Sequence, residues 1–310
     1  MKRVLITAIG SFSADVTIRS CREMDMMIVG CDIYPMEWIA NSLDVDIFYQ
    51  ALRFNDPGYI DFINQVCKEN EIDFIIPLTD PEVDILSENR EKLCAQVLIS
   101  DDKSVKLCRN KIAFADAVGG IETHIVGEFV PEFYPVVTKP IDGRSSQGLR
   151  VVENAEEYAL VDKNHIVQRY ISGPVIAVDV CRHPVTGHVE SLAREELLRT
   201  VNGAGTSVKI LNNKKLAEQC AEIAEKLGVS GTICLEFIRE NVGDGDSDEP
   251  EFVYHPLECN PRFSGGIAFS SMAGYDFIAA HVAAFTMPDI PYMGKIKEQY
   301  IARKYVEYRM

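Results

Sequence analysis

Short apolar runs alternate with helix-compatible segments through the first hundred residues, and this alternation constrains the fold more than any other feature of the chain. The apolar runs of strand length are residues 3–8, 27–31, 73–78 and 96–100. The helix-compatible segments between them are residues 11–24, 57–70 and 81–93. Strands that alternate with helices are typical of a parallel, doubly wound sheet. We therefore predict an α/β domain at the start of the chain.

The carboxyl ends of these predicted strands carry the first candidate ligand groups, because a doubly wound sheet binds its ligand at that edge. The groups there are Gly10, Asp32, Thr79, Asp80 and Glu82. A dinucleotide fingerprint would require GxGxxG after the first strand, but residues 10–15 read GSFSAD. An NAD site is therefore disfavoured, and an NAD-dependent enzyme is kept only as a third hypothesis.

The chain is acidic and has the composition of a globular protein. Its 310 residues exceed the usual size of one compact domain, so we expect two or three structural units. The formal charge of −16 repels nucleic acid and anionic membranes. No apolar stretch approaches the ~20 residues that span a bilayer, and nine cysteines without a CxxC pair are typical of a reducing compartment. We expect a cytoplasmic protein that binds neither nucleic acid nor membrane.

A strand near the end of the chain runs into residues that suit a metal and a phosphate. Residues 252–266 read FVYHPLECNPRFSGG. Successive side chains of a strand alternate between its faces, so Glu258 and Asn260 share one face. Their oxygens suit a hard cation, and Arg262 just beyond them suits a phosphate. The alternative is a strand end capped by a polar turn, with Arg262 on the surface.

A second carboxylate lies in the preceding predicted strand. Glu236 stands within the apolar run 229–240, where a buried carboxylate is costly unless it is paired or binds a metal. Residues 241–251 then form an acidic connection to the next strand. If the two strands are antiparallel neighbours, Glu236 and Glu258 come together.

A lysine followed by small residues predicts a phosphate site earlier in the chain. Residues 133–140 form a strand with Lys139 near its end, and a second strand follows at 149–152. The small residues between them include Gly143, Ser145, Ser146 and Gly148. Backbone N–H groups of such a loop can close over a phosphate, with Lys139 as a point charge beside them. The alternative is a flexible hairpin with a surface lysine.

Two further segments offer nucleotide or substrate contacts. The strand at residues 165–171 runs into a Gly-Pro break, which is either a hinge that meets an adenine edge or a plain turn. Arg194 and Arg199 precede a glycine-containing loop at residues 201–205. These arginines could bind an anionic substrate, or the run around Arg194 could be a solvated charged face.

In chain order these features resemble the ATP-grasp superfamily, and more narrowly its carbamoyl-phosphate-synthase-like and carboxylate–amine ligase branch. The residues that carry the resemblance are Lys111, 137–140 with the loop of small residues, 167–170, Glu236 and 258–262. The resemblance covers most of the chain and implies a mixed α/β and α+β architecture. Its parts are a Rossmann-like, doubly wound pre-ATP-grasp domain over 1–102, an ATP-grasp small subdomain with the phosphate loop over 103–170, and a large subdomain with the metal site over 171–310.

The resemblance also implies roles for individual residues. ATP would contact Lys111, Lys139, Gly143, Ser145, Ser146, Gly148, Gln168, Arg169, Tyr170 and Ile171. Mg²⁺ would be held by Glu236, Glu258 and Asn260. The groups that act in the reaction would be Arg262, Lys139 and Asn260. The residues themselves suggest further contacts for the substrates, which are Arg194, Arg199, Gly203, Ser264, Gly265 and Gly266, with Thr79, Asp80 and Glu82 from the first domain.

The implied activity is an ATP- and Mg²⁺-dependent ligation of a small carboxylic acid to an amine through an acyl phosphate, with release of ADP and phosphate. A homodimer is the implied assembly. Val175 stands where relatives often place a ribose-binding glutamate, and the loop of small residues has fewer glycines than theirs. These departures favour an alternative, an ATP-binding regulatory or subunit module without turnover. With no glutamine-amidotransferase domain or second synthetase half in this sequence, we do not expect complete carbamoyl phosphate synthesis.

Overall fold

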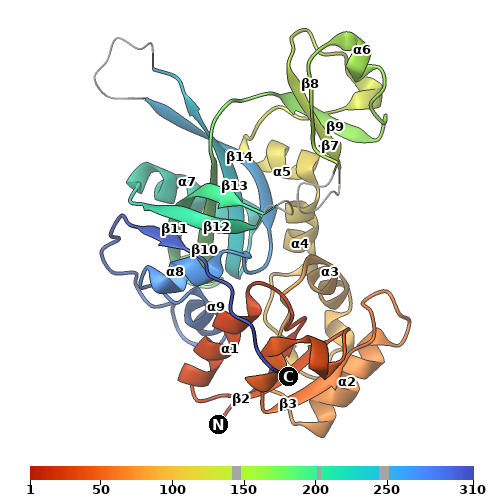
Figure 1. Cartoon of the computed structure of the whole chain (residues 1–310), viewed down its shortest axis with the longest axis vertical. Helices are drawn as coiled ribbons and strands as arrows, with labels where there is room; N and C mark the ends of the chain where they lie inside the picture. The colour runs from red at the N-terminus through yellow and green to blue at the C-terminus, as the bar shows by residue number, and fades with distance from the viewer. Residues whose placement is uncertain (142–147, 201–203, 244–250) are drawn as a thin grey trace.

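In the computed structural model the strands form three sheets, which Figure 1 shows as three stacked units. The structure describes residues 1–141, 148–200, 204–243 and 251–310. The first sheet has five strands in the order β3-β2-β1-β4-β5, and all its pairings are parallel. The other two sheets, of four and six strands, are antiparallel. The predicted succession of a parallel-sheet domain and an ATP-grasp fold is confirmed.

The first sheet is built from the alternating segments that the sequence predicted. Its strands are β1 (Arg3–Thr7), β2 (Met27–Asp32), β3 (Ile47–Gln50), β4 (Phe74–Ile76) and β5 (Gln96–Val97). The helices that follow them are α1 (Ala14–Glu23), α2 (Tyr59–Glu69) and α3 (Asp80–Glu88), with 3₁₀ turns η1 (Met36–Trp38), η2 (Ala40–Leu43) and η3 (Arg90–Lys92). Strand β3 has no counterpart in the predicted set, because all four of its residues are only partly buried or exposed. It lacks the fully apolar pattern that identified the other strands.

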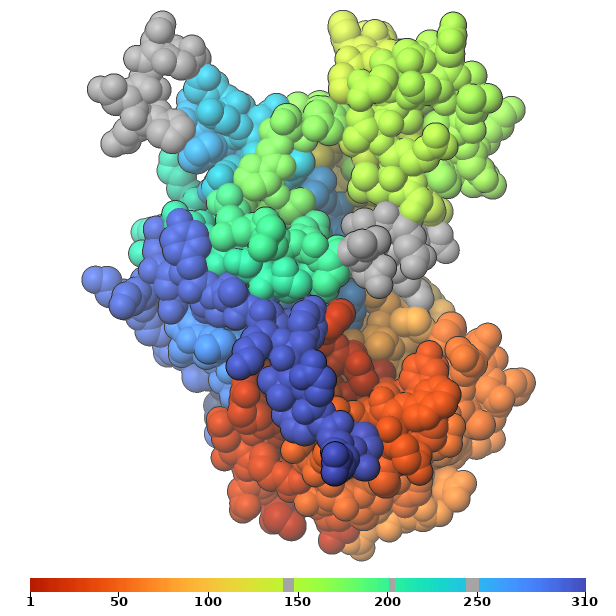
Figure 2. Space-filling model, viewed as in Figure 1, coloured from red at the N-terminus to blue at the C-terminus, as the bar shows by residue number. Residues whose placement is uncertain are grey.

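The four-stranded sheet, in the order β6-β9-β7-β8, encloses a small core of its own. Its elements are β6 (His124–Ile125), η4 (Val126–Glu128), β7 (Val136–Pro140), β8 (Arg150–Val152), α6 (Ala155–Tyr158) and β9 (His165–Arg169). The buried members of this core are Val126, Val136, Val152, Tyr158, Val161 and Val167. They all come from residues 126–167, so this sheet packs largely on itself. In Figure 2 it stands away from the rest of the molecule at the upper right.

The six-stranded sheet, in the order β14-β13-β10-β11-β12-β15, is the central unit. Its strands are β10 (Val175–Arg182), β11 (Val189–Arg199), β12 (Gly205–Leu211), β13 (Gly231–Asn241), β14 (Phe252–Asn260) and β15 (Tyr300–Ala302). The helices around it are α4 (Asp102–Arg109), α5 (Lys111–Val118), α7 (Lys214–Leu227), α8 (Ile267–Met272) and α9 (Phe277–Thr286). Phe114 of α5 packs with Cys220 of α7 and Leu235 of β13 in one core.

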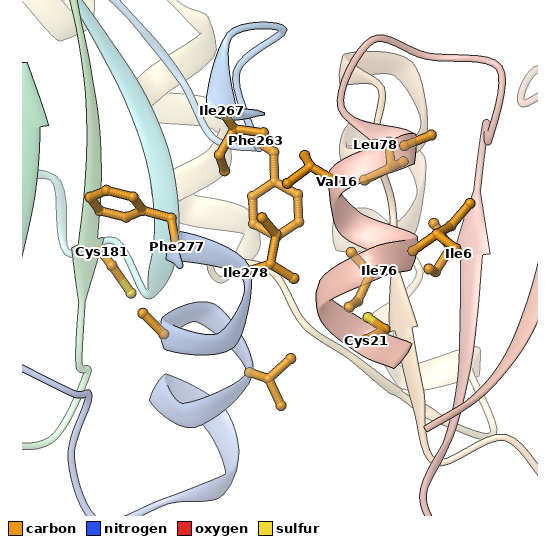
Figure 3. Packing of buried hydrophobic residues seen from close by; sticks show 14 of the residues in the cluster. Ile6, Val16, Cys21, Ile76, Leu78, Cys181, Phe263, Ile267, Phe277 and Ile278 are labelled. Carbon is orange, nitrogen blue, oxygen red and sulfur yellow. The ribbon is translucent and has the colours of Figure 1, made fainter. Parts of the chain in front are cut away.

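The first domain and the six-stranded sheet share a second hydrophobic core. Figure 3 shows Val16 of α1 near Phe263 and Ile278, across the gap between the two ribbons. His281 of α9 adds a buried polar link, since its Nδ1 accepts the N–H of Thr232 at 2.8 Å. Its Nε2 therefore carries the hydrogen and donates to the carbonyl oxygen of Leu98 in the first domain at 2.9 Å. These contacts fix the first domain against the sheet that carries β13 and β14.

No helix in the described ranges is both long and apolar enough to cross a membrane.

Candidate active site

Strands β13 and β14 bring two carboxylates face to face. The antiparallel register pairs Glu236 with Glu258, as the sequence predicted, and the ladder shifts directly after Glu236. Their side chains are 22% and 27% exposed. Burial, followed by the negative charge of Glu258, raises the pKa of Glu236. Two carboxylates held this closely would be stabilised by a cation between them.

Two buried lysines lie beside this carboxylate pair. Lys111 is the first residue of α5, whose N-terminus is capped by the side chain of Asn110. Its Nζ lies 3.8 Å from Oε2 of Glu258. Lys139, near the end of β7, is 8% exposed, and burial lowers its pKa while the charge of Glu258 opposes that shift. The lysines therefore reach the carboxylates from two different elements, α5 and the four-stranded sheet.

A cavity of about 420 Å³ opens between the first domain and the six-stranded sheet. The predicted site residues that line it are Arg194, Arg199, Glu236, Glu258, Asn260, Arg262, Ser264, Gly265 and Gly266. Residues 11–13 and 78–81 of the first domain also line it. The structure thus gathers the predicted metal ligands and most of the predicted substrate contacts around one space.

All three arginines that line this wall are paired with carboxylates. Arg262 donates from Nη2 to Oδ2 of Asp80 at 2.9 Å and from Nη1 to the carbonyl oxygen of Phe263 at 2.9 Å. Arg199 Nη2 lies 3.5 Å from Oε2 of Glu236. Arg262 is therefore not a plain surface residue, and it joins the end of β14 to the first domain.

Arg194 is buried, which corrects the expectation of a solvated charged face around it. It is 1% exposed and donates from Nη1 to Oδ2 of Asp179 at 2.7 Å. Its Nη2 donates to Oγ of Ser264 at 2.8 Å. A Cβ on Gly266 would lie 2.8 Å from the Arg194 Nε, so glycine is required where the chain passes the guanidinium.

Two acidic residues of this site were absent from the predicted set. Asp179 lies in apolar β10, is 0% exposed, and also accepts a 2.6 Å hydrogen bond from Ser270. A carboxylate inside an apolar run was the signal that identified Glu236, and it would have identified Asp179 as well. The Glu196 side chain is 4% exposed and its Oε1 lies 3.3 Å from Nε of Arg194. The solvated-face expectation is wrong for Glu196 too.

The predicted adenine contacts lie at the end of β9 and in the connection to β10. The side chain of Gln168 is buried and donates to Oγ1 of Thr123 at 2.8 Å. Arg169 pairs with Glu240 of β13 at 3.0 Å. Tyr170 is 42% exposed and Ile171 is 4% exposed. The role of this segment in binding adenine stays a prediction.

Four predicted residues lie outside the described part of the chain. They are Gly143, Ser145, Ser146 and Gly203. Gly148, at the edge of the same loop, has a φ of 73°, and a Cβ there would lie 2.9 Å from the Pro140 ring. That position therefore needs glycine.

Within the described ranges, no group of three or more His, Cys, Asp or Glu side chains could hold a metal ion by itself. Glu236, Glu258 and Asn260 supply only two carboxylates and one amide. A site of this kind suits Mg²⁺, which usually keeps several waters and is bound by one or two carboxylates together with substrate phosphates.

Comparison with known families identifies the chain. Residues 108–266 match the model of the ATP-grasp domain, and residues 14–98 match that of the PylC-like N-terminal domain. The matched ATP-grasp segment covers half of the chain, which therefore belongs to the ATP-grasp family. A search of curated proteins found no match.

Solved structures of three enzymes show the same fold at low sequence identity. The biotin carboxylase domain of 2-oxoglutarate carboxylase from Hydrogenobacter thermophilus, solved with MgADP, ADP and bicarbonate, has a TM-score of 0.77 at 18% identity, covering 94% of this chain and 71% of that one. N5-carboxyaminoimidazole synthetase from Staphylococcus aureus, complexed with ADP, has a TM-score of 0.73 at 15% identity, covering 96% and 81%. The L-amino acid ligase from Bacillus licheniformis has a TM-score of 0.71 at 15% identity, covering 91% and 73%.

Proposed function

We propose that this chain is a ligase that uses MgATP to join a small carboxylic acid to an amine through an acyl phosphate, releasing ADP and phosphate. The observation that carries the proposal is the arrangement of Glu236 and Glu258 between buried Lys111 and Lys139 and the arginine-lined cavity. The nucleotides bound by the ADP complexes named above, and the reaction named for the amino acid ligase, support it by analogy.

The carboxylate pair fits a bound metal. Glu236, Glu258 and the amide oxygen of Asn260 are the hard oxygen donors that Mg²⁺ prefers. Because burial and the charge of Glu258 raise the pKa of Glu236, a cation at this edge would relieve the repulsion between the two groups. Bound there, Mg²⁺ would supply positive charge to the triphosphate.

The two lysines would bind the phosphates of ATP. Lys139 is nearly buried, and in such a setting a charge interacts more strongly than it does in water. Lys111 is held in place by its position at the start of α5. Because Lys139 belongs to the four-stranded sheet and Lys111 packs with the six-stranded sheet, bound phosphates would join these two units.

The arginine side of the cavity would bind the carboxylic acid. In the first step a carboxylate oxygen attacks the γ-phosphorus, and the bond from that phosphorus to the β,γ-bridging oxygen breaks to release ADP. Two anions meet in this step, so Arg262 would neutralise charge on the transferred phosphoryl group. Arg199 would orient the substrate carboxylate.

In the second step the amine nitrogen attacks the carbonyl carbon of the acyl phosphate. The carbon–oxygen bond to phosphate breaks, phosphate leaves with the electron pair, and a proton passes from the nitrogen to the departing phosphate as the amide forms. Water would hydrolyse the acyl phosphate if it reached this carbon, so the site must close during the reaction.

Phosphate release from MgATP tests the proposal directly. Pools of small carboxylic acids and amines would be mixed with the protein, and we expect at least one pair of pools to raise the rate. Glu258→Gln should lower that rate by at least about a hundredfold. Loss of a group that only hydrogen-bonds to a metal ligand already lowers metal affinity or activity about ten- to a hundredfold. Glu218→Gln is the matched control, since that side chain is 61% exposed on α7.

The same measurement decides between the ligase and the alternative module. ATP binding would be seen as a rise in melting temperature. If ATP binds but no pool gives phosphate release, the protein is an ATP-binding subunit or sensor and the ligase proposal is wrong. Equal rates in wild type and Glu258→Gln would show that the carboxylate pair is not the metal edge.

A further inference from the structure

A second cavity, of about 630 Å³, opens at the carboxyl edge of the first sheet. Its wall includes the last residue of β2 and residues from the segments that follow β1 and β2. Ser11, Thr79 and Pro81 line both this cavity and the candidate active site, so the two spaces adjoin. A molecule in the second cavity would therefore lie next to the reacting groups.

The walls of the second cavity are largely apolar and aromatic. Tyr34 and Trp38 stack with their ring centroids 5.9 Å apart, and Ile33, Ile39 and Phe54 complete the apolar wall. Trp38 is 72% exposed and Phe54 is 41% exposed. Aromatic side chains exposed at the mouth of a cavity can gain contact area when an apolar ligand covers them.

The buried ionisable side chains of this cavity are acidic. Asp32 is 6% exposed and Glu82 is 8% exposed, whereas Arg53 is exposed and its charge is screened by water. Asp32 accepts the N–H of Gly10 at 2.8 Å and that of Tyr34 at 3.1 Å. Burial raises the pKa of Glu82, so the carboxylate of Asp32 is the group of this wall that favours a cationic ligand over an anion.

The loop after β1 is poorly suited to a phosphate. The N–H of Ile9 already donates to the carbonyl oxygen of Cys31 at 3.2 Å, and that of Ser11 donates to Ala8 at 3.0 Å. The N–H of Gly10 is taken by Asp32. A nucleotide phosphate would have to displace these bonds, so the geometry argues against a dinucleotide in this cavity.

The two cavities differ in the side chains that line them. The candidate active site combines three arginines, Arg194, Arg199 and Arg262, with four acidic side chains, Asp80, Glu196, Glu236 and Glu258, so its arginines can contact an anion. The second cavity contains two buried carboxylates and an apolar wall. A ligase for an acid and an amine needs adjacent places for an anion and for an amine, and the amine is cationic before it reacts.

We propose that the second cavity binds the amine substrate, and that this amine carries an apolar, preferably aromatic, group. The inference rests on the proposed function for its role in catalysis, but binding itself requires no ATP. The ammonium group would lie toward Asp32, and the apolar group would lie against Trp38 and Phe54. After the ammonium group has lost a proton to water, the nitrogen would enter the reaction past Ser11 and Thr79.

The chain offers a direct probe, because Trp38 is its one tryptophan. Phenethylamine would be titrated into the protein without ATP, and tryptophan emission would be recorded. We expect a saturable blue shift as the indole loses contact with water. The matched ligand is 3-phenylpropionate, which has the same ring with a carboxylate in place of the amine, and we expect at least about tenfold weaker binding for it.

A pair of phenylalanine variants tests the apolar wall. Phe54→Ala should weaken phenethylamine binding by about fivefold, because part of the apolar contact is lost. Phe133→Ala is the control, since Phe133 is 80% exposed on the small subdomain and lies outside the cavity lining. We expect its dissociation constant to equal that of the wild type.

Three results would overturn the inference. They are the absence of a saturable change with phenethylamine, binding of 3-phenylpropionate as tight as that of the amine, and an unchanged dissociation constant in Phe54→Ala. A saturable response to adenosine or NADH in place of the amine would also overturn it. If the protein binds the amine saturably but releases no phosphate from MgATP, the second cavity is still an amine-binding site, but the proposed ligase activity is wrong.

Discussion

The first domain and the four-stranded sheet both flank the six-stranded sheet, but they are attached to it in different ways. The first domain shares a continuous hydrophobic core with α8 and α9, seen in Figure 3, and His281 bonds across the same interface. The four-stranded sheet has a core of its own. Its side-chain link to β13 includes the exposed Arg169–Glu240 pair.

This difference separates the parts of the site that should stay fixed from the part that should move. Both cavities involve the first domain, whose position is set by buried apolar contacts. Lys139 is carried by the four-stranded sheet, which continues into β10 through Gly173. A Cβ on Gly173 would lie 1.9 Å from the carbonyl oxygen of Arg239, so only glycine fits at this crossing. We expect the lysine to approach and leave the carboxylate pair while the cavities keep their shape.

The largest expected effect is on the shared core. Phe277 is 0% exposed, and Phe277→Ala should lower the free energy of unfolding by about 3–5 kcal/mol through lost burial and a cavity. Denaturant unfolding measures this, with Phe133→Ala as the control that should change stability by less than about 0.5 kcal/mol. A loss below about 1 kcal/mol for Phe277→Ala would show that the interface does not hold the domain in place.

The buried histidine should make the same interface sensitive to acid. Burial lowers the pKa of His281 to about 4, from 6.5 for the free side chain. Between pH 4 and pH 6.5, His281 is mostly protonated in the unfolded chain and mostly neutral in the folded protein, so protonation favours unfolding. Neutral His281 therefore makes its full contribution to the free energy of unfolding above pH 6.5. This contribution, on the order of 3 kcal/mol, is lost as the pH falls toward 4.

Unfolding measured at pH 7 and pH 4.5 would test this dependence. His281→Gln should remove the histidine part of the difference, whereas His124→Gln, on the four-stranded sheet, should retain it. An identical pH dependence in wild type and His281→Gln would contradict the prediction.

Lys139 should matter for ATP affinity and not for the position of the first domain. Lys139→Ala removes a charge-assisted contact to phosphate, and we expect ATP to bind about ten- to a hundredfold more weakly. Calorimetric titration gives the affinity, and Lys163→Ala, an exposed lysine of the same unit, is the control. Equal ATP affinity in Lys139→Ala and wild type would remove the phosphate-binding assignment.

The smallest expected effect is on the exposed ion pair. Arg169→Gln should change the free energy of unfolding by less than about 1 kcal/mol, because Arg169 is 54% exposed and solvent screens the pair. Faster hydrogen exchange in β7 and β9 would show that the pair nevertheless restrains the small sheet. A loss of more than about 2 kcal/mol in the free energy of unfolding would show that the four-stranded sheet is not attached more weakly than the first domain.

Local patterns in the sequence were enough to predict much of the fold and the residues at the centre of the candidate active site. The first domain follows from the alternation of apolar strands and helices. The meeting of Glu236 and Glu258 follows from two consecutive strands joined by a short connection, because their pairing is a local event. The predicted fold class is confirmed by the sheets and by the matched families.

Other parts of the site depend on residues that are far apart in the chain. Arg262 and Asp80 are separated by 182 residues, and Ser264 and Arg194 by 70. The run around Arg194 has the composition of a surface, yet the side chains of Arg194 and Glu196 are buried, and the chain at Ser264 and Gly266 packs against the Arg194 guanidinium. Strand β15 is only three residues long, so its own pattern gave no basis for predicting its place beside β12.

The sequence by itself determined which side chains could bind a metal and phosphates, because those depend on residue type and strand alternation. The tertiary structure alone decided where the substrates could lie. Both cavities are formed by segments that meet only when the first domain packs on the six-stranded sheet or when its own strand ends come together. Burial in that packing, which no local pattern encodes, gives one cavity three arginines among its carboxylates and the other an apolar wall with a buried aspartate.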